Sequence, residues 1–112
     1  MSRTLLVWTD MPVQELALRA FAEGRGGYWN EVVGGEAVIE RGNARVFIAV
    51  TERAEEAFAD DLDFAVSEMG SRPASMLSIR IGHAEGSVEL AEEIAAESVA
   101  NWGGFLDRNQ PA

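Results

Sequence analysis

The sequence contains no cysteine and no lysine, and it has a single histidine, His83. Without cysteine the chain can form neither disulfides nor thiolate metal sites, and a chain without cross-links suits a reducing cytoplasm, where we expect the protein. No apolar run approaches the roughly 20 residues of a membrane span. The first run, residues 5–8, is also too short for the core of a signal peptide. We therefore expect no membrane association.

Positive charge is scarce as well, because nine arginines accompany 19 acidic residues in a chain of 112. The net charge of −10 repels the phosphates of nucleic acids and of anionic membranes, which excludes both as partners of the general surface. It favours a basic protein partner instead. The length suits a single domain over residues 1–112, with flexible ends at about residues 1–2 and 108–112.

Three strand-forming runs separated by glycine-containing turns predict an antiparallel meander. The runs are rich in β-branched and aromatic side chains, and they cover residues 28–33, 36–41 and 44–50. The pairs Gly34-Gly35 and Gly42-Asn43 between them suit two-residue hairpin turns, because such turns need positive φ angles.

Further strands are predicted outside the meander. The unbroken apolar run over residues 4–8 indicates a buried strand. Alternation over residues 75–81 indicates a strand with one solvated side. One side holds Leu77, Ile79 and Ile81, and the other holds Met76, Ser78 and Arg80. Phe105-Leu106 suits a short last strand.

Apolar side chains three and four positions apart predict a helix after the first strand and another near the end of the chain. The first is capped by Asp10 and ends at Gly24, and the last runs from about Val88 to Trp102. The first helix is expected to bury Val13, Leu16, Ala17, Ala20 and Phe21. The last helix is expected to bury Leu90, Ala91, Ile94, Ala95, Ser98 and Trp102.

A middle helix is predicted from Thr51, which can cap it, to Met69, which precedes Gly70. Three central aspartates are poor helix formers and favour a break near Asp60. Its buried side is expected to hold Ala54, Phe58, Leu62, Ala65 and Met69. The resulting order, β-α-β-β-β-α-β-α with a short last strand, predicts a single α+β domain. It has an antiparallel meander sheet with helices packed on it, and a ferredoxin-like relative fits this order.

Negative charge is concentrated in two of the predicted helices. Residues 52–69 hold seven acids and one base, residues 85–97 hold five acids and no base, and the rest of the chain carries a charge of +1. Like charges four positions apart, as in Glu89, Glu93 and Glu97, each cost a helix a few tenths of a kcal/mol. Helix stability therefore does not explain the stripes, although a solvated face that keeps the protein soluble remains the simple alternative.

We expect a binding protein rather than an enzyme, with an acidic helical surface that holds a basic protein partner. A bacterial inhibitor, antitoxin or immunity protein works in this manner. Phe64 lies beside Asp60 and outside the apolar stripe, and it either anchors the interface or packs under a neighbouring loop. The residues expected to contact the partner are Glu56, Asp60, Asp63, Phe64, Glu89, Glu93 and Glu97.

A small ligand-binding or enzymatic domain is an alternative from another class. The loop before the last helix contains His83, Glu85, Gly86 and Ser87, and backbone N–H groups at a helix start can hold an anion. Gly86-Ser87 is also what an ordinary turn and helix cap require. A cleft would form beside this loop if the end of the first strand, Trp8-Thr9-Asp10, lay next to it.

The third alternative is a homo-oligomeric structural protein paired through the meander or an edge strand. We expect neither a cofactor nor a metal, because one histidine and no cysteine leave only carboxylates as strong ligands. Asp60, Asp61 and Asp63 also lack the turn glycine and the distal glutamate of a calcium loop.

Overall fold

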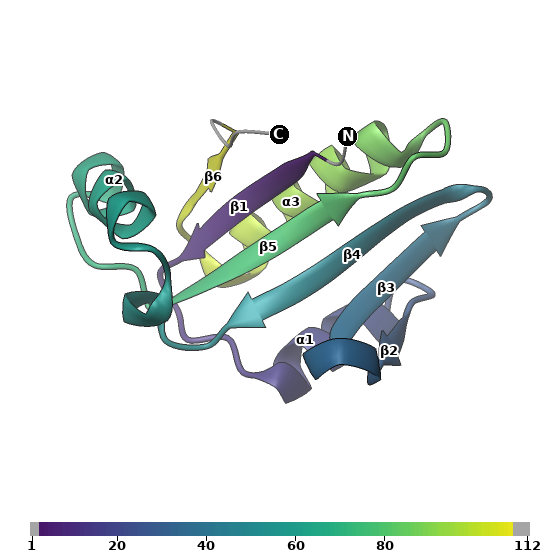
Figure 1. The fold of residues 1–112 in the computed structure, drawn as a ribbon, viewed down its shortest axis with the longest axis horizontal. Coiled ribbons are helices and arrows are strands. Elements are labelled where there is room, and N and C mark those ends of the chain that lie inside the picture. Colours follow the sequence, from purple (N-terminus) through teal and green to yellow (C-terminus); the bar gives the residue numbers. More distant parts are fainter. Residues whose placement is uncertain (1–2, 109–112) are drawn as a thin grey trace.

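An antiparallel six-stranded sheet with the order β2-β3-β4-β5-β1-β6 forms the centre of the molecule (Figure 1). The structure is a computed structural model and describes residues 3–108. With η marking a 3₁₀ turn, the elements are β1 (Thr4–Thr9), α1 (Glu15–Glu23), β2 (Tyr28–Asn30), η1 (Val32–Gly34), β3 (Glu36–Arg41), β4 (Ala44–Thr51), η2 (Ala54–Glu56), α2 (Ala59–Met69), β5 (Ser75–Ile81), α3 (Ser87–Trp102) and β6 (Phe105–Asp107).

Four of the strands have the connectivity of a ferredoxin-like motif. The motif has the chain order β-α-β-β-α-β and consists of β1, α1, β4, β5, α3 and β6. Its four strands lie side by side in the order β4-β5-β1-β6. Two insertions complete the fold. The β2–β3 pair extends the sheet beyond β4, and the segment η2–α2 is inserted between β4 and β5. The predicted α+β domain with a meander sheet is confirmed.

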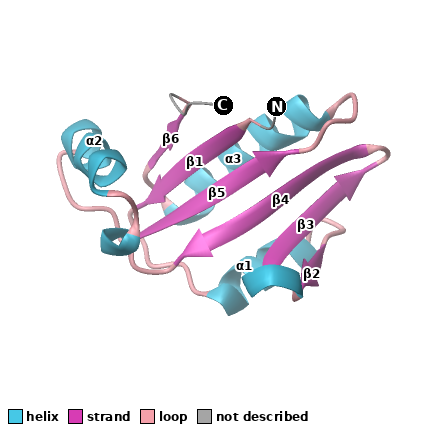
Figure 2. Ribbon diagram, in the orientation of Figure 1, coloured by secondary structure: helices cyan, strands magenta, loops and turns pink. Residues whose placement is uncertain are grey.

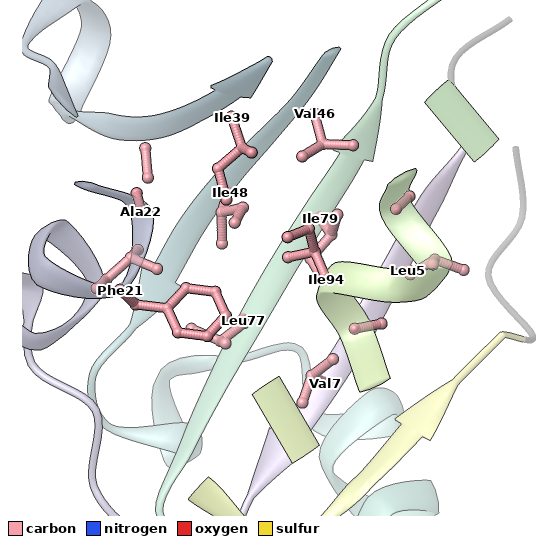
Figure 3. Close-up of a cluster of buried hydrophobic side chains, with 14 of the residues drawn as sticks. Leu5, Val7, Phe21, Ala22, Ile39, Val46, Ile48, Leu77, Ile79 and Ile94 are labelled. Atoms are coloured by element: carbon pink, nitrogen blue, oxygen red, sulfur yellow. The ribbon is translucent and has the colours of Figure 1, made fainter. Parts of the chain in front are cut away.

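Helices α1 and α3 cover one face of the sheet (Figure 2). Alternate strand residues point into that layer, so that Leu5 and Val7 of β1 and Ile79 of β5 join Ile94 of α3 in the main core (Figure 3). All six residues predicted to be buried along the last helix are buried. That helix begins at Ser87, one residue earlier than predicted.

In the described part of the chain, helical segments cover the opposite face at the end where β1 finishes and β5 begins. There η2 and α2 lie over Leu6 and Trp8 of β1, and Ala65 of α2 is buried against them. Because β1 is enclosed on both sides, residues 5–8 are buried, as the unbroken apolar run predicted, and Thr9 is buried as well. We call this whole face of the sheet the open face, because within residues 3–108 no helix covers the rest of it.

The first part of the meander differs from the prediction. The strand predicted over residues 28–33 ends at Asn30, and η1 replaces the two-residue turn predicted at Gly34-Gly35. The side-chain oxygen of Asn30 accepts the backbone N–H of Val32 at 3.1 Å, which stabilises a local turn instead of further strand pairing. The turn at Gly42-Asn43 is confirmed, and its glycine has a φ of 63°.

Helix α1 begins at Glu15 rather than near Asp10, and its buried face is shifted. Val13 is buried ahead of the helix, where its backbone N–H donates to the Ser75 hydroxyl at 2.9 Å. This bond holds Val13 outside the helix, so the helix and its buried face begin later in the chain than predicted. Leu16 is consequently 73% exposed, whereas the helix buries Leu18, Phe21 and Ala22.

The middle helix departs most from the prediction. Thr51 is the last residue of β4 rather than a helix cap, and α2 begins only at Ala59. The chain is extended at Ala57 and Phe58, close to the break predicted near Asp60. Phe58 therefore leaves the apolar side and is 84% exposed, contrary to the prediction. The rest of the predicted apolar side packs on the sheet, with Ala54 and Ala65 buried and Leu62 and Met69 partly buried.

The chain ends add two observations. Flexible ends were predicted at residues 1–2 and 108–112, and all of these except Arg108 lie outside the described residues. Arg108 lies 2.5 Å from the carboxylate of Glu92, which ties it to α3. In the described part of the chain, none of the helices has the length and apolar character needed to cross a membrane.

Candidate functional site

The two acidic stripes predicted from the sequence lie on different sides of the sheet. Helix α3 packs in the main core layer, whereas α2 lies on the open face at one end of the sheet (Figure 1). Glu89, Glu93 and Glu97 therefore do not share one surface with the predicted partner-binding residues of η2 and α2. The predicted partner-binding residues form two separate groups.

The acids of α3 face arginines of the same chain. Arg41 lies 2.5 Å from the carboxylate of Glu93, and Arg25 pairs with Glu97. The hydrogen bond from Arg41 holds the pKa of Glu93 below its usual range. Glu89 is exposed and forms no ion pair within residues 3–108. These ion pairs offset the repulsion between the acids of α3. The acidic stripe of α3 is therefore explained by contacts within the fold, which the spacing of acids along the helix does not show.

The acids of η2 and α2 are different, because arginines of the described part of the chain form no ion pair with most of them. Arg53 lies 3.2 Å from Glu55, and that hydrogen bond adds to a backbone bond in lowering the pKa of Glu55. Asp60 and Asp61 lie in the first turn of α2, where the helix dipole favours acids. Within residues 3–108, no ion pair involves the carboxylates of Glu56, Asp60, Asp61, Asp63 or Glu68.

A hollow of about 420 Å³ lies where η2 and α2 meet the open face of the sheet, and we call it the Phe58 hollow. The strands contribute two apolar side chains, Leu6 and Met76, and the hydroxyl-bearing residues Thr4, Thr51 and Ser78. The inserted segment contributes Glu56, Ala57, Phe58 and Asp61. The site therefore combines apolar groups, hydroxyls, two carboxylates and one exposed aromatic ring.

A second hollow of about 440 Å³ adjoins the first, since Thr51 and Glu56 line both. It also contains Glu15 and Glu52, and the Glu52 carboxylate accepts the backbone N–H of Glu15 at 2.9 Å. Carboxylates thus continue around the end of β4. We call this surface the acidic end, and it comprises Glu15, Glu52, Glu55, Glu56, Asp60, Asp61 and Asp63.

Phe58 differs from its predicted position, whereas Phe64 lies outside the apolar stripe as predicted. Phe64, predicted either as an interface anchor or as packed under a neighbouring loop, contacts Phe105 of β6 with ring centroids 6.3 Å apart and is 38% exposed. Phe58, predicted to be buried, is exposed and lines the Phe58 hollow. Helical spacing missed this residue, although the adjacent acids at Asp60 and Asp61 are a signal for a helix that begins after Phe58.

The loop proposed as an alternative ligand site is held by structural contacts. Ser87 is buried, and its hydroxyl accepts the backbone N–H of Arg45 at 3.0 Å, which ties the start of α3 to β4. Gly86 caps the helix with a φ of 91°, and Glu85 and His83 are exposed. Ser87 therefore has a role in holding the fold.

A hollow of about 240 Å³ beside this loop contains His83 and two arginines. Arg80 stacks over Phe47 at 4.2 Å and lies 3.3 Å from Glu36. Arg45 lies 3.5 Å from the carboxylate of Glu40. Both guanidinium groups thus have a carboxylate of the chain itself beside them, which weakens the case for an anion site here.

The cleft considered between the first strand and this loop does not form. Thr9 pairs with Ser75 at the start of β5, whereas His83 follows the other end of that strand. Trp8 and Asp10 therefore lie at the opposite end of the sheet from the loop. Among residues 3–108, no three acidic or histidine side chains are placed to hold a metal ion.

Comparison with known proteins found no match to a family model, a curated protein or a solved structure. The residues of the acidic end and of the Phe58 hollow are therefore the basis for a function.

Proposed function

We propose that this protein binds a basic protein partner through the acidic end of the sheet, as a bacterial inhibitor, antitoxin or immunity protein of the cytoplasm would. The observation that carries the proposal is the contrast between the two acidic helices. Arginines of the chain already pair with Glu93 and Glu97 on α3. The carboxylates of Glu56, Asp60, Asp61 and Asp63 lack such partners within residues 3–108, so they remain available to arginine and lysine of another protein.

Charge and shape have separate roles in this proposal. A concentration of unpaired carboxylates accelerates encounter with a positive surface, and this steering weakens as salt is added. Phe58 provides the apolar contact that a purely charged surface lacks, since aromatic residues surrounded by polar groups often dominate binding energy. Glu89, Glu93 and Glu97 contribute to the long-range field from the other side of the sheet.

Two matched variants test this proposal. The first replaces Asp60, Asp61 and Asp63 by asparagine, and the second replaces Glu89, Glu93 and Glu97 by glutamine. Both variants change the net charge from −10 to −7. A difference in partner binding between them therefore reports the position of the removed charges and not the total charge. Circular dichroism and thermal melting establish that each variant is folded before binding is compared.

The variants are used in pull-downs from a lysate of the source organism at low and high salt. Captured basic proteins are identified, purified and used for association kinetics over a salt titration. We expect the α2 triple variant to associate at least about tenfold more slowly than wild type at low salt, and the α3 variant to stay within about twofold. The proposal is wrong if no basic protein is retained, or if both variants associate as fast as wild type.

A further inference from the structure

We infer that the Phe58 hollow is a binding site for one arginine side chain, presented by the basic partner. This inference rests on the proposed function, and it names the group that the acidic end recognises. The argument comes from the lining of the hollow and from the way in which this chain holds its own arginines.

Within residues 3–108, three arginines stack over an aromatic ring, and each also pairs with a glutamate. Arg25 lies 3.7 Å from the centre of the Phe21 ring and pairs with Glu97. The other two sets are Arg19 with Trp29, Glu15 and Glu31, and Arg80 with Phe47 and Glu36. An arginine between an aromatic face and a carboxylate is therefore a recurring arrangement in this protein.

The Phe58 hollow contains the same groups without the arginine. Phe58 provides the ring, and Glu56 and Asp61 of the same inserted segment provide carboxylates. Neither carboxylate forms an ion pair within residues 3–108. A guanidinium group placed there gains a cation–π contact and two charge-assisted hydrogen bonds.

The remaining groups of the hollow match the rest of an arginine side chain. Leu6 and Met76 provide apolar surface for its methylene stem. The hydroxyls of Thr4, Thr51 and Ser78 make no hydrogen bond within residues 3–108, so they can accept N–H groups that the carboxylates do not reach. Lysine fits less well, because it has a point charge in place of a planar group with five donors.

The size of the hollow also suits this occupant. Its volume of about 420 Å³ lies toward the lower end of the range of small-molecule sites, which runs from roughly 300 to 1,000 Å³. A single long side chain can enter it from an extended segment that crosses the open face. The adjoining hollow with Glu15 and Glu52 leaves room for the neighbouring residues of that segment.

The test uses N-acetyl-L-arginine methylamide as a probe of the isolated protein. Its neutral analogue, N-acetyl-L-citrulline methylamide, has nearly the same shape, and the lysine derivative has the same charge. Titrations are followed by ¹H–¹⁵N NMR. We expect saturable shifts at the amides of Leu6, Met76 and Ser78 with the arginine probe, and affinities at least about fivefold weaker for the other two.

Matched variants locate the site. Phe58→Ala and Asp61→Asn should each weaken arginine binding at least about fivefold. Leu16→Ala removes a similarly exposed apolar side chain outside both hollows. Glu68→Gln removes a charge on α2 outside both hollows and outside the acidic end, so both controls should bind as wild type. The inference is overturned if citrulline binds as well as arginine, or if the two site variants behave like the two controls.

Failure of this inference can be distinguished from failure of the proposed function. If the α2 triple variant slows association of a basic partner while Phe58→Ala does not, the acidic end binds the partner and the arginine site is excluded. If arginine binds in the hollow but no basic protein is captured, the arginine site stands and the proposed function is excluded.

Discussion

The ring of Phe64 on α2 lies against the ring of Phe105 on β6, with an angle of 55° between their planes. This contact joins the inserted helix to the edge strand of the sheet. Phe58, immediately before α2, has no comparable ring contact among residues 3–108 and faces solvent. We therefore expect Phe64 to contribute to the stability of the fold, and we propose Phe58 for contact with a partner.

Replacing each phenylalanine by alanine separates these roles. Phe64→Ala should lower the free energy of unfolding by roughly 1–2 kcal/mol, because it removes one ring of a partly exposed aromatic pair. Phe58→Ala should change it by less than about 0.5 kcal/mol, as expected for an exposed side chain. Urea denaturation measures both values. Equal losses for the two variants would contradict the assignment.

Trp8 is fully buried beneath η2 and α2, yet its indole N–H has no hydrogen-bond partner within residues 3–108. Trp8→Phe should therefore cost less than about 1.5 kcal/mol, because the loss of ring volume is offset by removal of an unsatisfied donor. Trp8→Ala should cost roughly 3–5 kcal/mol through the cavity it leaves. Both are measured by urea denaturation. If Trp8→Phe lowers the free energy of unfolding as much as Trp8→Ala does, the indole N–H is hydrogen-bonded in the folded protein and the prediction is wrong.

Elements with local and repeated signals are the ones that the sequence predicts well. The alternation over residues 75–81 coincides with β5, and the spacing of buried residues gives α3 to within one residue. Helix α2 was predicted too long because distant contacts decide where it starts. The backbone N–H of Ala54 donates to the carbonyl of Ala74, and Ala65 packs near Trp8. Spacing along the helix contains no information on either contact.

The candidate site was predictable only in part, because it also depends on contacts between residues far apart in the chain. Acidic residues can be located from the sequence, but their pairing depends on how the strands and helices are arranged. Arg41 lies 52 positions from Glu93, and Arg25 lies 72 positions from Glu97. These separations made the α3 stripe look unpaired, and the structure changes which acids we propose for binding.

Ser87 provides a test of the structural role assigned to the loop before α3. Ser87→Ala leaves the backbone N–H of Arg45 without its acceptor and should lower the free energy of unfolding by roughly 1–2 kcal/mol with no ligand present. Ser78→Ala is the control, because its hydroxyl makes no hydrogen bond within residues 3–108, and it should change stability by less than about 0.5 kcal/mol. If Ser87→Ala is as stable as wild type, the hydroxyl is not needed for folding and a ligand role returns.

The pair between Arg41 and Glu93 predicts a dependence of stability on pH. Because Arg41 lowers the pKa of Glu93 in the folded state, the unfolded chain binds a proton there more readily, near the ordinary pKa of about 4.3. The stabilisation is therefore fully present above that pH and is lost as the pH falls through the folded-state pKa. Arg41→Gln removes the pair and should melt at a lower temperature than wild type at pH 7.

The difference in melting temperature between wild type and Arg41→Gln should shrink as the pH is lowered to 3, and it should also shrink in 1 M salt, because both side chains are partly exposed. Glu93→Gln is the control, since adding Arg41→Gln to it should have little further effect. Thermal melts at several pH values provide the comparison. A difference that stays constant from pH 7 to pH 3 would show that Arg41 acts through packing, and the explanation of the α3 stripe by ion pairing would then be wrong.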